Sequence, residues 1–276
     1  FLGKCVWKVA VSCAVLVVLV ALAVPVKAIT WGEPDVDNIY SNVGAIVVEW
    51  PNRGANQFCS GTLIAPAVFL VAAHCNAYLQ IELDAGRLEQ SMIHISFSPD
   101  NIYDTTTWIG IEAIISHPKY GSGEDGDNVY DVGVVILSET VDQPLAVFPD
   151  LGFLDSLWDG DVLRDGPEIA EFIAVGYGQT IQWPQAVQLD NGSGRWYVES
   201  GFHALTHSLL ILFKNNNFDY GGTCYGDSGG PTFFEYDGEL WLVGIHSMSN
   251  ASCSAMSFDY RTDIADTLDF LDPYLP

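Results

Sequence analysis

Short runs of β-branched and aromatic residues recur along the chain, and turn-forming residues bound most of them. Runs of this length and composition predict the strands of antiparallel sheets connected by hairpins. An Asp-Gly pair at 237–238 separates two such runs and predicts a tight hairpin. The predicted strands cover residues 43–50, 61–73, 111–116, 131–137, 171–178, 209–213, 231–236 and 240–247.

Helical periodicity stands out in one place, close to the C-terminal end. Ile264, Leu268 and Leu271 fall on one face of a predicted helix over residues 262–271. The chain of 276 residues is 49% hydrophobic, which suffices for one large domain or two small barrels that share an interface. No internal repeat and no Pro/Ser-rich linker divides it. We therefore expect an all-β fold with a terminal helix.

The first 28 residues differ in pattern from the rest of the chain. Lys4 and Lys8 precede an apolar run over 9–24, and small residues end the segment at Ala28. This layout is typical of a secretory signal peptide. The alternative is a membrane anchor, but the apolar run is shorter than the ~20 residues that span a bilayer. We expect cleavage after Ala28, a secreted protein, and no membrane association once the leader is removed.

Acidic residues dominate the charge of the chain. The formal net charge is −25, and it becomes −28 without the three lysines of the leader. Such a surface repels nucleic acid and anionic membranes, so we expect no nucleic-acid partner. Two interpretations stay open: the charge steers neutral or basic substrates towards the protein, or it only keeps an exported protein soluble.

Four cysteines follow the leader, and in an exported chain an even number predicts disulfides. Their order alone leaves three pairings open. Zinc is the competing use, but the chain contains no Cys-x-x-Cys pair. The four are Cys59, Cys75, Cys224 and Cys253.

An acidic loop at 121–128 offers a second kind of metal site. Glu124, Asp125 and Asp127 carry oxygen ligands of the type that calcium binds. The alternative is a solvated acidic loop, because the ordered EF-hand spacing is absent. We expect no metal and no other cofactor.

Candidate chemistry begins with the segment Gly-Asp-Ser-Gly-Gly-Pro at 226–231, which places Ser228 between glycines. A serine hydroxyl is a poor nucleophile until a base takes its proton, and a buried carboxylate fixes the tautomer of that base. His74 ends an apolar run, and Asp131 directly precedes another. Taken singly, His74 is a structural histidine and Asp131 a strand cap. Together with Ser228 they indicate a catalytic set.

Three segments, 60–75, 131–137 and 224–231, resemble the signature blocks of chymotrypsin-like (trypsin-fold) serine peptidases, in that family's order of His, Asp and Ser. Shorter segments, HPKY at 117–120, VGYG at 175–178 and LVGIHS at 242–247, extend the resemblance from about Ile29 to the end. The resemblance implies two six-stranded antiparallel β-barrels packed face to face, with a C-terminal helix. We expect one peptidase domain over 29–276, with its barrel boundary near 140–165.

The resemblance also implies a role for each catalytic residue. His74 would act as general base and then acid, Asp131 would orient it, and Ser228 would attack the scissile carbonyl. The backbone N–H groups of Gly226 and Ser228 would form the oxyanion hole, where a glycine suits a conformation that disfavours side chains. Ser247 matches the serine that bonds the buried acid.

Two further implications concern covalent links and activation. The family pairs Cys59 with Cys75, and Cys224 with Cys253. Its mature N-terminal ammonium pairs with the residue that corresponds to Asp227, and Ile29 follows the predicted leader cut. We expect leader removal itself to free the activating amine.

The resemblance places Gly222 at the base of the primary substrate pocket, Ser249 and Ser257 on its walls, and Tyr225 at its rim. The segment that includes Ser247 also borders this pocket. No acid stands at the base, so a preference for Arg or Lys is not expected. The sequence favours uncharged, small or medium side chains.

Two other functional classes compete with a secreted, monomeric endopeptidase acting on proteins or peptides. The pattern Gly-x-Ser-x-Gly also occurs in lipases and esterases, but that fold needs an acid and then a histidine after the serine, on alternating strands and helices. Only His246 follows Ser228. The other class is a catalytically silent binding protein on the peptidase fold, because a fold does not fix a function.

Overall fold

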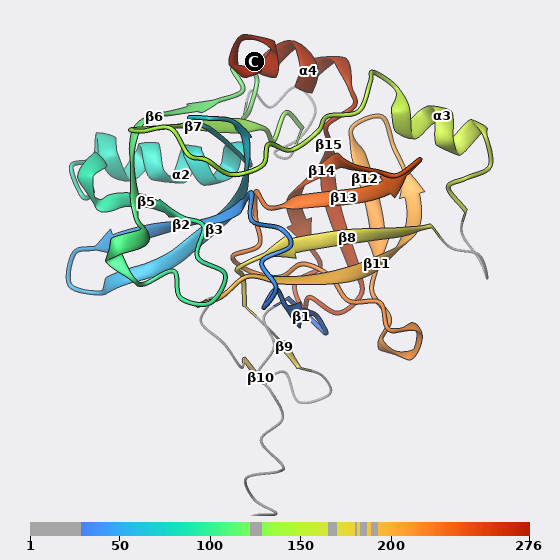
Figure 1. Cartoon of the computed structure of the whole chain (residues 1–276), viewed down its shortest axis with the longest axis horizontal. Helices are drawn as coiled ribbons and strands as arrows, with labels where there is room; N and C mark the ends of the chain where they lie inside the picture. Colours follow the sequence, from blue (N-terminus) through green and yellow to red (C-terminus); the bar gives the residue numbers. More distant parts are fainter. Residues whose placement is uncertain (1–28, 122–128, 165–169, 180, 183–186, 189–192) are drawn as a thin grey trace, which may run out of the picture.

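The computed structural model describes residues 29–121, 129–164, 170–179, 181–182, 187–188 and 193–276. Within them the chain forms two closed antiparallel barrels that lie side by side, the first blue to green and the second yellow to red (Figure 1). Each barrel has six strands. The prediction of an all-β fold built from two six-stranded barrels is therefore confirmed.

The first barrel closes in the order β2-β3-β4-β7-β6-β5, with β5 pairing back onto β2. The predicted strand over 61–73 is two strands, because a turn at Pro66 and Ala67 separates β3 from β4. Proline lacks the N–H that a continuing ladder needs. The strands are β2 (Val43–Trp50), β3 (Gly54–Ala65), β4 (Val68–Val71), β5 (Ile93–Ser96), β6 (Ile109–Ser116) and β7 (Gly133–Leu137).

The second barrel has the strand order β11-β12-β15-β14-β13-β8 and closes through the pairing of β8 with β11. The predicted hairpin turns at Asp237 and Gly238, which both have positive φ. Its strands are β8 (Glu171–Gly176), β11 (Trp196–Leu205), β12 (Leu209–Phe213), β13 (Pro231–Tyr236), β14 (Glu239–Ser249) and β15 (Met256–Arg261). Short strands lie outside the barrel: β1 (Glu33–Pro34) on β11, and the pair β9 (Ile181–Gln182) and β10 (Val187–Gln188).

Helices are few among the described residues, and they lie outside the barrels (Figure 1). The terminal helix begins three residues later than predicted, because Thr262 still donates its N–H to Val243 O and Ile264 is extended. The α-helices are α2 (Ala73–Asp84), α3 (Phe153–Asp159) and α4 (Ala265–Leu271). The 3-10 turns are η1 (Gln90–Met92), η2 (Thr105–Thr107), η3 (Asn216–Phe218) and η4 (Asp272–Tyr274).

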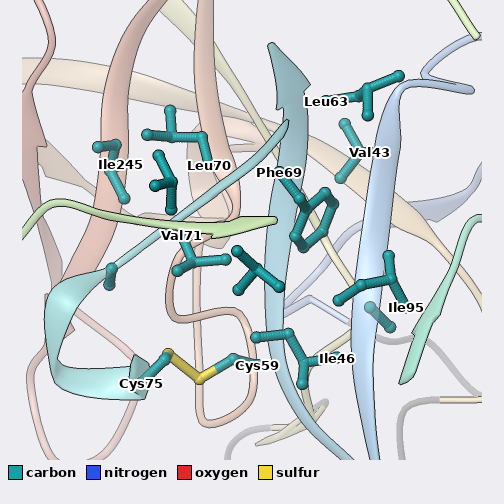
Figure 2. Close-up of a cluster of buried hydrophobic side chains, with 14 of the residues drawn as sticks. Val43, Ile46, Cys59, Leu63, Phe69, Leu70, Val71, Cys75, Ile95 and Ile245 are labelled. Atoms are coloured by element: carbon teal, nitrogen blue, oxygen red, sulfur yellow. A yellow bond between two sulfur atoms is a disulfide. The ribbon is translucent and has the colours of Figure 1, made fainter. Parts of the chain in front are cut away.

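The largest hydrophobic cluster fills the first barrel and continues into the second. Figure 2 shows Leu70 and Val71 of β4 beside Ile245 of β14, with the Cys59–Cys75 disulfide at the edge of the cluster. Burial of these side chains stabilises the fold by about 25 cal/mol for each Å² of apolar surface removed from water. Because both barrels share this cluster, the end of β4 is held against the second barrel.

A buried ion pair adds a polar link between the barrels. Arg195 Nε lies 2.7 Å from Asp35 Oδ2, and both side chains are fully buried. The same guanidinium donates to the carbonyls of Val43 and Phe97, which belong to the first barrel and the segment after β5. Arg195 directly precedes β11 of the second barrel, so its hydrogen bonds connect the two barrels.

Candidate active site

His74 stands where β4 gives way to α2. The strand ends at Val71 and the helix begins at Ala73, so His74 lies in the first helical turn and not at the end of a strand. Its Nδ1 lies 2.8 Å from Asp131 Oδ2, and its backbone N donates to Asp131 Oδ1 at 2.8 Å. With Nδ1–H directed at a carboxylate, Nε2 is left as the proton acceptor.

Asp131 lies two residues before β7, which begins at Gly133 and not at residue 131 as predicted, and its side chain is fully buried. Ser247 Oγ donates to Asp131 Oδ2 at 2.5 Å, in addition to the two bonds from His74. A buried carboxylate is costly unless hydrogen bonds replace its water. Three donors meet this requirement here and hold the acid in one orientation.

Ser228 lies on a tight loop between Cys224 and Pro231. Gly226 has φ +94° and Gly229 has φ +83°, a region that side chains disfavour. The Gly226 carbonyl accepts hydrogen bonds from Gln57 Nε2 at 2.7 Å and from Ser60 Oγ at 3.0 Å. The first barrel therefore fixes the conformation of this second-barrel loop.

The loop also brings Ser228 next to the helix that carries His74. The Ser228 carbonyl accepts from Ser60 N at 2.9 Å and lies 3.8 Å from Cys75 Sγ. Among the described residues no hydrogen bond joins Ser228 Oγ to His74. Such contacts are often long before substrate binds.

Two backbone amides of this loop lack acceptors. In the part of the chain that the structure describes, neither Gly226 N nor Ser228 N donates a hydrogen bond to the protein. Neighbouring amides do so: Asp227 N donates to Cys224 O, and Gly229 N to His246 O. Paired free N–H groups beside a serine are the kind of donors that stabilise an oxyanion.

A pocket of about 190 Å³ opens next to Ser228. Of the predicted pocket residues, Tyr225, Ser247 and Ser249 line it. Gly222 and Ser257 do not, and both lie behind its wall: Lys214 packs against Gly222, and Ser257 pairs with Ser249 in the strand ladder. The full lining is Thr223, Cys224, Tyr225, Ser228, His246, Ser247, Met248, Ser249 and Cys253.

Sequence reasoning missed several residues around the site. His246 and Thr223 line the pocket, and Gln57 and Ser60 hold the loop. Lys214 is one of two lysines after residue 28, and the sequence predicted no role for it. Its partners come from segments that are distant in the chain, so no local pattern could have revealed its place.

The structure contains both disulfides that the resemblance implied, Cys59–Cys75 and Cys224–Cys253. The first joins β3 to the His74 helix, and the second joins two residues of the pocket lining. The Cys59–Cys75 disulfide also argues against the zinc alternative. The ligand atoms of Cys59, His74 and Cys75 lie within 4.8 Å of one another, but the two sulfurs are bonded together and supply no thiolate.

A second candidate metal site, a histidine pair, gives no support for a metal. His203 and His207 have the spacing His-x-x-x-His, but they lie on β11 and the turn after it and not on one helix. No third ligand joins them among the described residues. Glu124, Asp125 and Asp127 of the predicted calcium loop lie outside the described residues.

The predicted activation pair is not in contact in this chain. Ile29 is fully buried against Ala174, Trp196 and Val198. The Asp227 carboxylate instead accepts from Gly178 N at 2.7 Å and from Cys224 N at 2.8 Å. In the whole sequence the nitrogen of Ile29 is an uncharged peptide amide, which cannot form an ion pair. The pairing with Asp227 therefore stays a prediction.

A search of the described residues finds no helix with the length and apolar character that crossing a bilayer requires. The predicted leader, residues 1–28, lies outside the described residues.

Two closed six-stranded barrels, with a histidine–aspartate contact and a glycine-bounded serine at their junction, define a protein of the trypsin-fold class. The trypsin family model matches residues 37–271, and the chain belongs to this family of serine peptidases.

Individual relatives are distant. The chain is 25% identical to spermosin of Halocynthia roretzi, over 88% of this chain and 65% of that protein. It is 24% identical to the phenoloxidase-activating enzyme of Bombyx mori, over 79% of this chain and 52% of that protein. It is 25% identical to human chymotrypsin-like elastase family member 1, over 74% of this chain and 79% of that protein. The chain thus spans only about half to two thirds of the first two.

Proposed function

We propose that this protein is a secreted serine endopeptidase that hydrolyses peptide bonds through an acyl-enzyme. Ser228 attacks the scissile carbonyl, and His74 takes its proton and returns it to the leaving amine. Asp131 holds the imidazole in the required tautomer. The observation that carries the proposal is the 2.8 Å contact between His74 Nδ1 and Asp131 Oδ2, which leaves Nε2 as the base.

The amides of Gly226 and Ser228 form the oxyanion hole in this proposal. Their lack of acceptors among the described residues supports the assignment. The bonds that anchor the Gly226 carbonyl support it further, because a fixed loop needs little reorganisation when charge develops. One such donor is worth roughly 3 kcal/mol of transition-state stabilisation.

Activation follows removal of residues 1–28. The new ammonium of Ile29 then pairs with the Asp227 carboxylate. Before cleavage, burial raises the pKa of Asp227 to about 7 and so favours its protonated form. A cation within contact would lower that pKa and stabilise the charged form. N-terminal sequencing of the secreted enzyme tests this step and should find Ile29 as the first residue.

The domain organisation and the setting of the protein belong to the same proposal. The leader covers 1–28, the peptidase domain covers 29–276, and the barrel boundary lies near 140–165, between β7 and β8. The enzyme acts outside the cell as a monomer on protein or peptide substrates, without a cofactor.

An active-site label separates this proposal from its alternatives. The purified, processed protein is treated with a sulfonyl fluoride, and its intact mass is measured. We expect one adduct on the wild type, one on Ser156→Ala, whose serine lies on the exposed helix α3, and none on Ser228→Ala. A catalytically silent binding protein would take up no label. An esterase would be labelled but would cleave lipid esters and not peptides.

A further inference from the structure

Lys214 lies beneath the pocket that contains Ser228. It follows β12 directly and is 4% exposed, so its side chain is buried along its whole length. The chain of methylenes passes under Gly222, where an added Cβ would lie 2.6 Å from Lys214 Cε. The ammonium donates to Thr223 O at 2.5 Å and to Ser249 Oγ at 2.7 Å. Both acceptors belong to residues that line the pocket.

No carboxylate contacts this ammonium in the described part of the chain. An ammonium has three N–H donors, and here two neutral oxygens accept from it. Asp227 and Asp259 interact with Lys214 electrostatically, but among the described residues no ion pair within 4.0 Å joins either acid to its nitrogen. Asp227 is occupied by two backbone amides, and Asp259 accepts from Thr232 Oγ1.

Below neutral pH the buried groups around Lys214 carry a net positive charge. Burial lowers the pKa of Lys214 to about 8, although Asp227 and Asp259 act in the opposite direction. Burial raises the pKa of Asp227 and of Asp259 to about 7. At pH 6 the lysine is therefore charged and Asp259 is largely protonated. In the processed enzyme the Ile29 ammonium compensates the charge of Asp227, so the charge of Lys214 stays unbalanced.

The hydroxyl of Ser249 is a hydrogen-bond donor in the pocket wall. Because Ser249 Oγ accepts from Lys214, the proton of its hydroxyl is directed elsewhere, and within the described residues it reaches Met256 O at 3.2 Å. His246 also lines the pocket but offers it no donor, because its Nδ1 donates to Asp227 O at 3.2 Å and Nε2 of the neutral ring is an acceptor. The residues that line the pocket include no Asp or Glu.

We propose that this pocket binds an acidic side chain, glutamate or aspartate, at the residue whose carbonyl Ser228 attacks. The Ser249 hydroxyl turns from Met256 O, which keeps the Asn250 N–H as its donor, and donates to the substrate carboxylate. The Lys214 ammonium behind Ser249 supplies the charge that the pocket otherwise lacks. Hydrogen bonds to charged groups are stronger than neutral ones. This inference rests on the proposed peptidase function and differs from the uncharged preference that the sequence alone suggested.

Peptide substrates that differ only at this residue test the proposal. We expect kcat/KM at pH 6 to be at least about tenfold higher for Glu than for Gln. Lys214→Met keeps the length of the side chain and removes the charge, so the ratio of Glu to Gln should fall to one or below. Lys119→Met is the matched control, because Lys119 is exposed and lies at the surface beside Asp266. Its Glu/Gln ratio should equal that of the wild type.

A second variant and a pH series protect the test against misfolding of Lys214→Met. Ser249→Ala removes the donor but keeps the ammonium, and it should reduce the Glu/Gln ratio several-fold. In the wild type the ratio should fall as pH rises through about 8, because Lys214 loses its proton while Asp259 becomes charged. His246 stays neutral over this range, because burial lowers its pKa to about 3.

The two proposals fail in different ways. A wild-type enzyme that takes the sulfonyl fluoride label and cleaves peptides, but with kcat/KM for Gln equal to or above that for Glu, overturns the acidic pocket alone. Equal Glu/Gln ratios in wild type and Lys214→Met overturn it as well. A protein that takes no label and cleaves no peptide overturns the peptidase function itself.

Discussion

Ser247 Oγ donates to Asp131 Oδ2 at 2.5 Å, the same carboxylate oxygen that lies 2.8 Å from His74 Nδ1. The serine belongs to β14 of the second barrel, whereas Asp131 precedes a strand of the first. One short hydrogen bond therefore ties the orientation of the acid to the relative position of the barrels. Ser247 is in this respect a positioning residue for the histidine.

Replacing Ser247 by alanine should lower kcat by about 10- to 100-fold, because a hydrogen bond to a charged group contributes about 1.5–3 kcal/mol. Steady-state kinetics on one good peptide substrate measures the effect. Ser247→Thr keeps the hydroxyl and should recover most of the activity. A Ser247→Ala enzyme within twofold of wild-type kcat would contradict the positioning role.

Gly226→Ala should reduce kcat/KM at least 100-fold, because the residue has φ +94° and an added Cβ would lie 2.4 Å from Gln57 Oε1. The strain would displace the amide that we assign to the oxyanion hole. Gly238→Ala is the matched control: it also has positive φ, but nothing lies within 4 Å of its Cβ. That variant should lose about 1 kcal/mol of stability and keep its activity. Equal activity losses in both variants would refute the assignment.

Asp35→Ala should lower the free energy of unfolding by about 3–5 kcal/mol, because it leaves the Arg195 guanidinium buried and unpaired. It also removes the acceptor for Ile39 N and Tyr40 N. Urea unfolding followed by tryptophan fluorescence measures the change. Glu82→Ala breaks a surface pair with Arg87 and should have a much smaller effect, because solvent screens that pair. Similar costs for the two variants would mean that the buried pair contributes little.

The sequence predicted those parts of the fold whose hydrophobic pattern is local. The strands over 43–50, 209–213 and 231–236 have the predicted bounds, and Asp237 and Gly238 turn as expected. Strand β15 was missed because polar side chains within it are buried by partners elsewhere, as Arg261 is by Asp155 and Asp263. Helix α2 was missed because its apolar residues do not gather on one face.

The candidate site divides in the same way. The motifs around His74, Asp131 and Ser228 could be found in the sequence, since each lies in a short recognisable segment. The ammonium of Lys214 could not, because its position depends on the pairing of β12 with β15 and on the packing of its methylenes under Gly222. Specificity here is set by the tertiary fold and not by a local motif.

Asp259 gives a prediction for the pH dependence of stability. It is fully buried, Thr232 donates to one carboxylate oxygen, and the other has no partner among the described residues. Burial raises its pKa to about 7, well above the ordinary value near 3.9. Between these values the folded state holds a proton that the unfolded state releases. The contribution of this group is therefore complete below about pH 4 and is lost as pH rises through 7.

Asp259→Asn keeps the shape of the protonated acid but cannot ionise. The free energy of unfolding of the variant minus that of the wild type should therefore be larger at pH 8 than at pH 5. Asp227 is present in both proteins and largely cancels in the difference. Lys214 attracts the Asp259 carboxylate, and the raised pKa of Asp259 already includes that attraction. Urea unfolding of both proteins at the two pH values measures this difference. A stability difference that does not change with pH, or that moves against the variant as pH rises, would show that Asp259 does not carry a raised pKa in the folded protein.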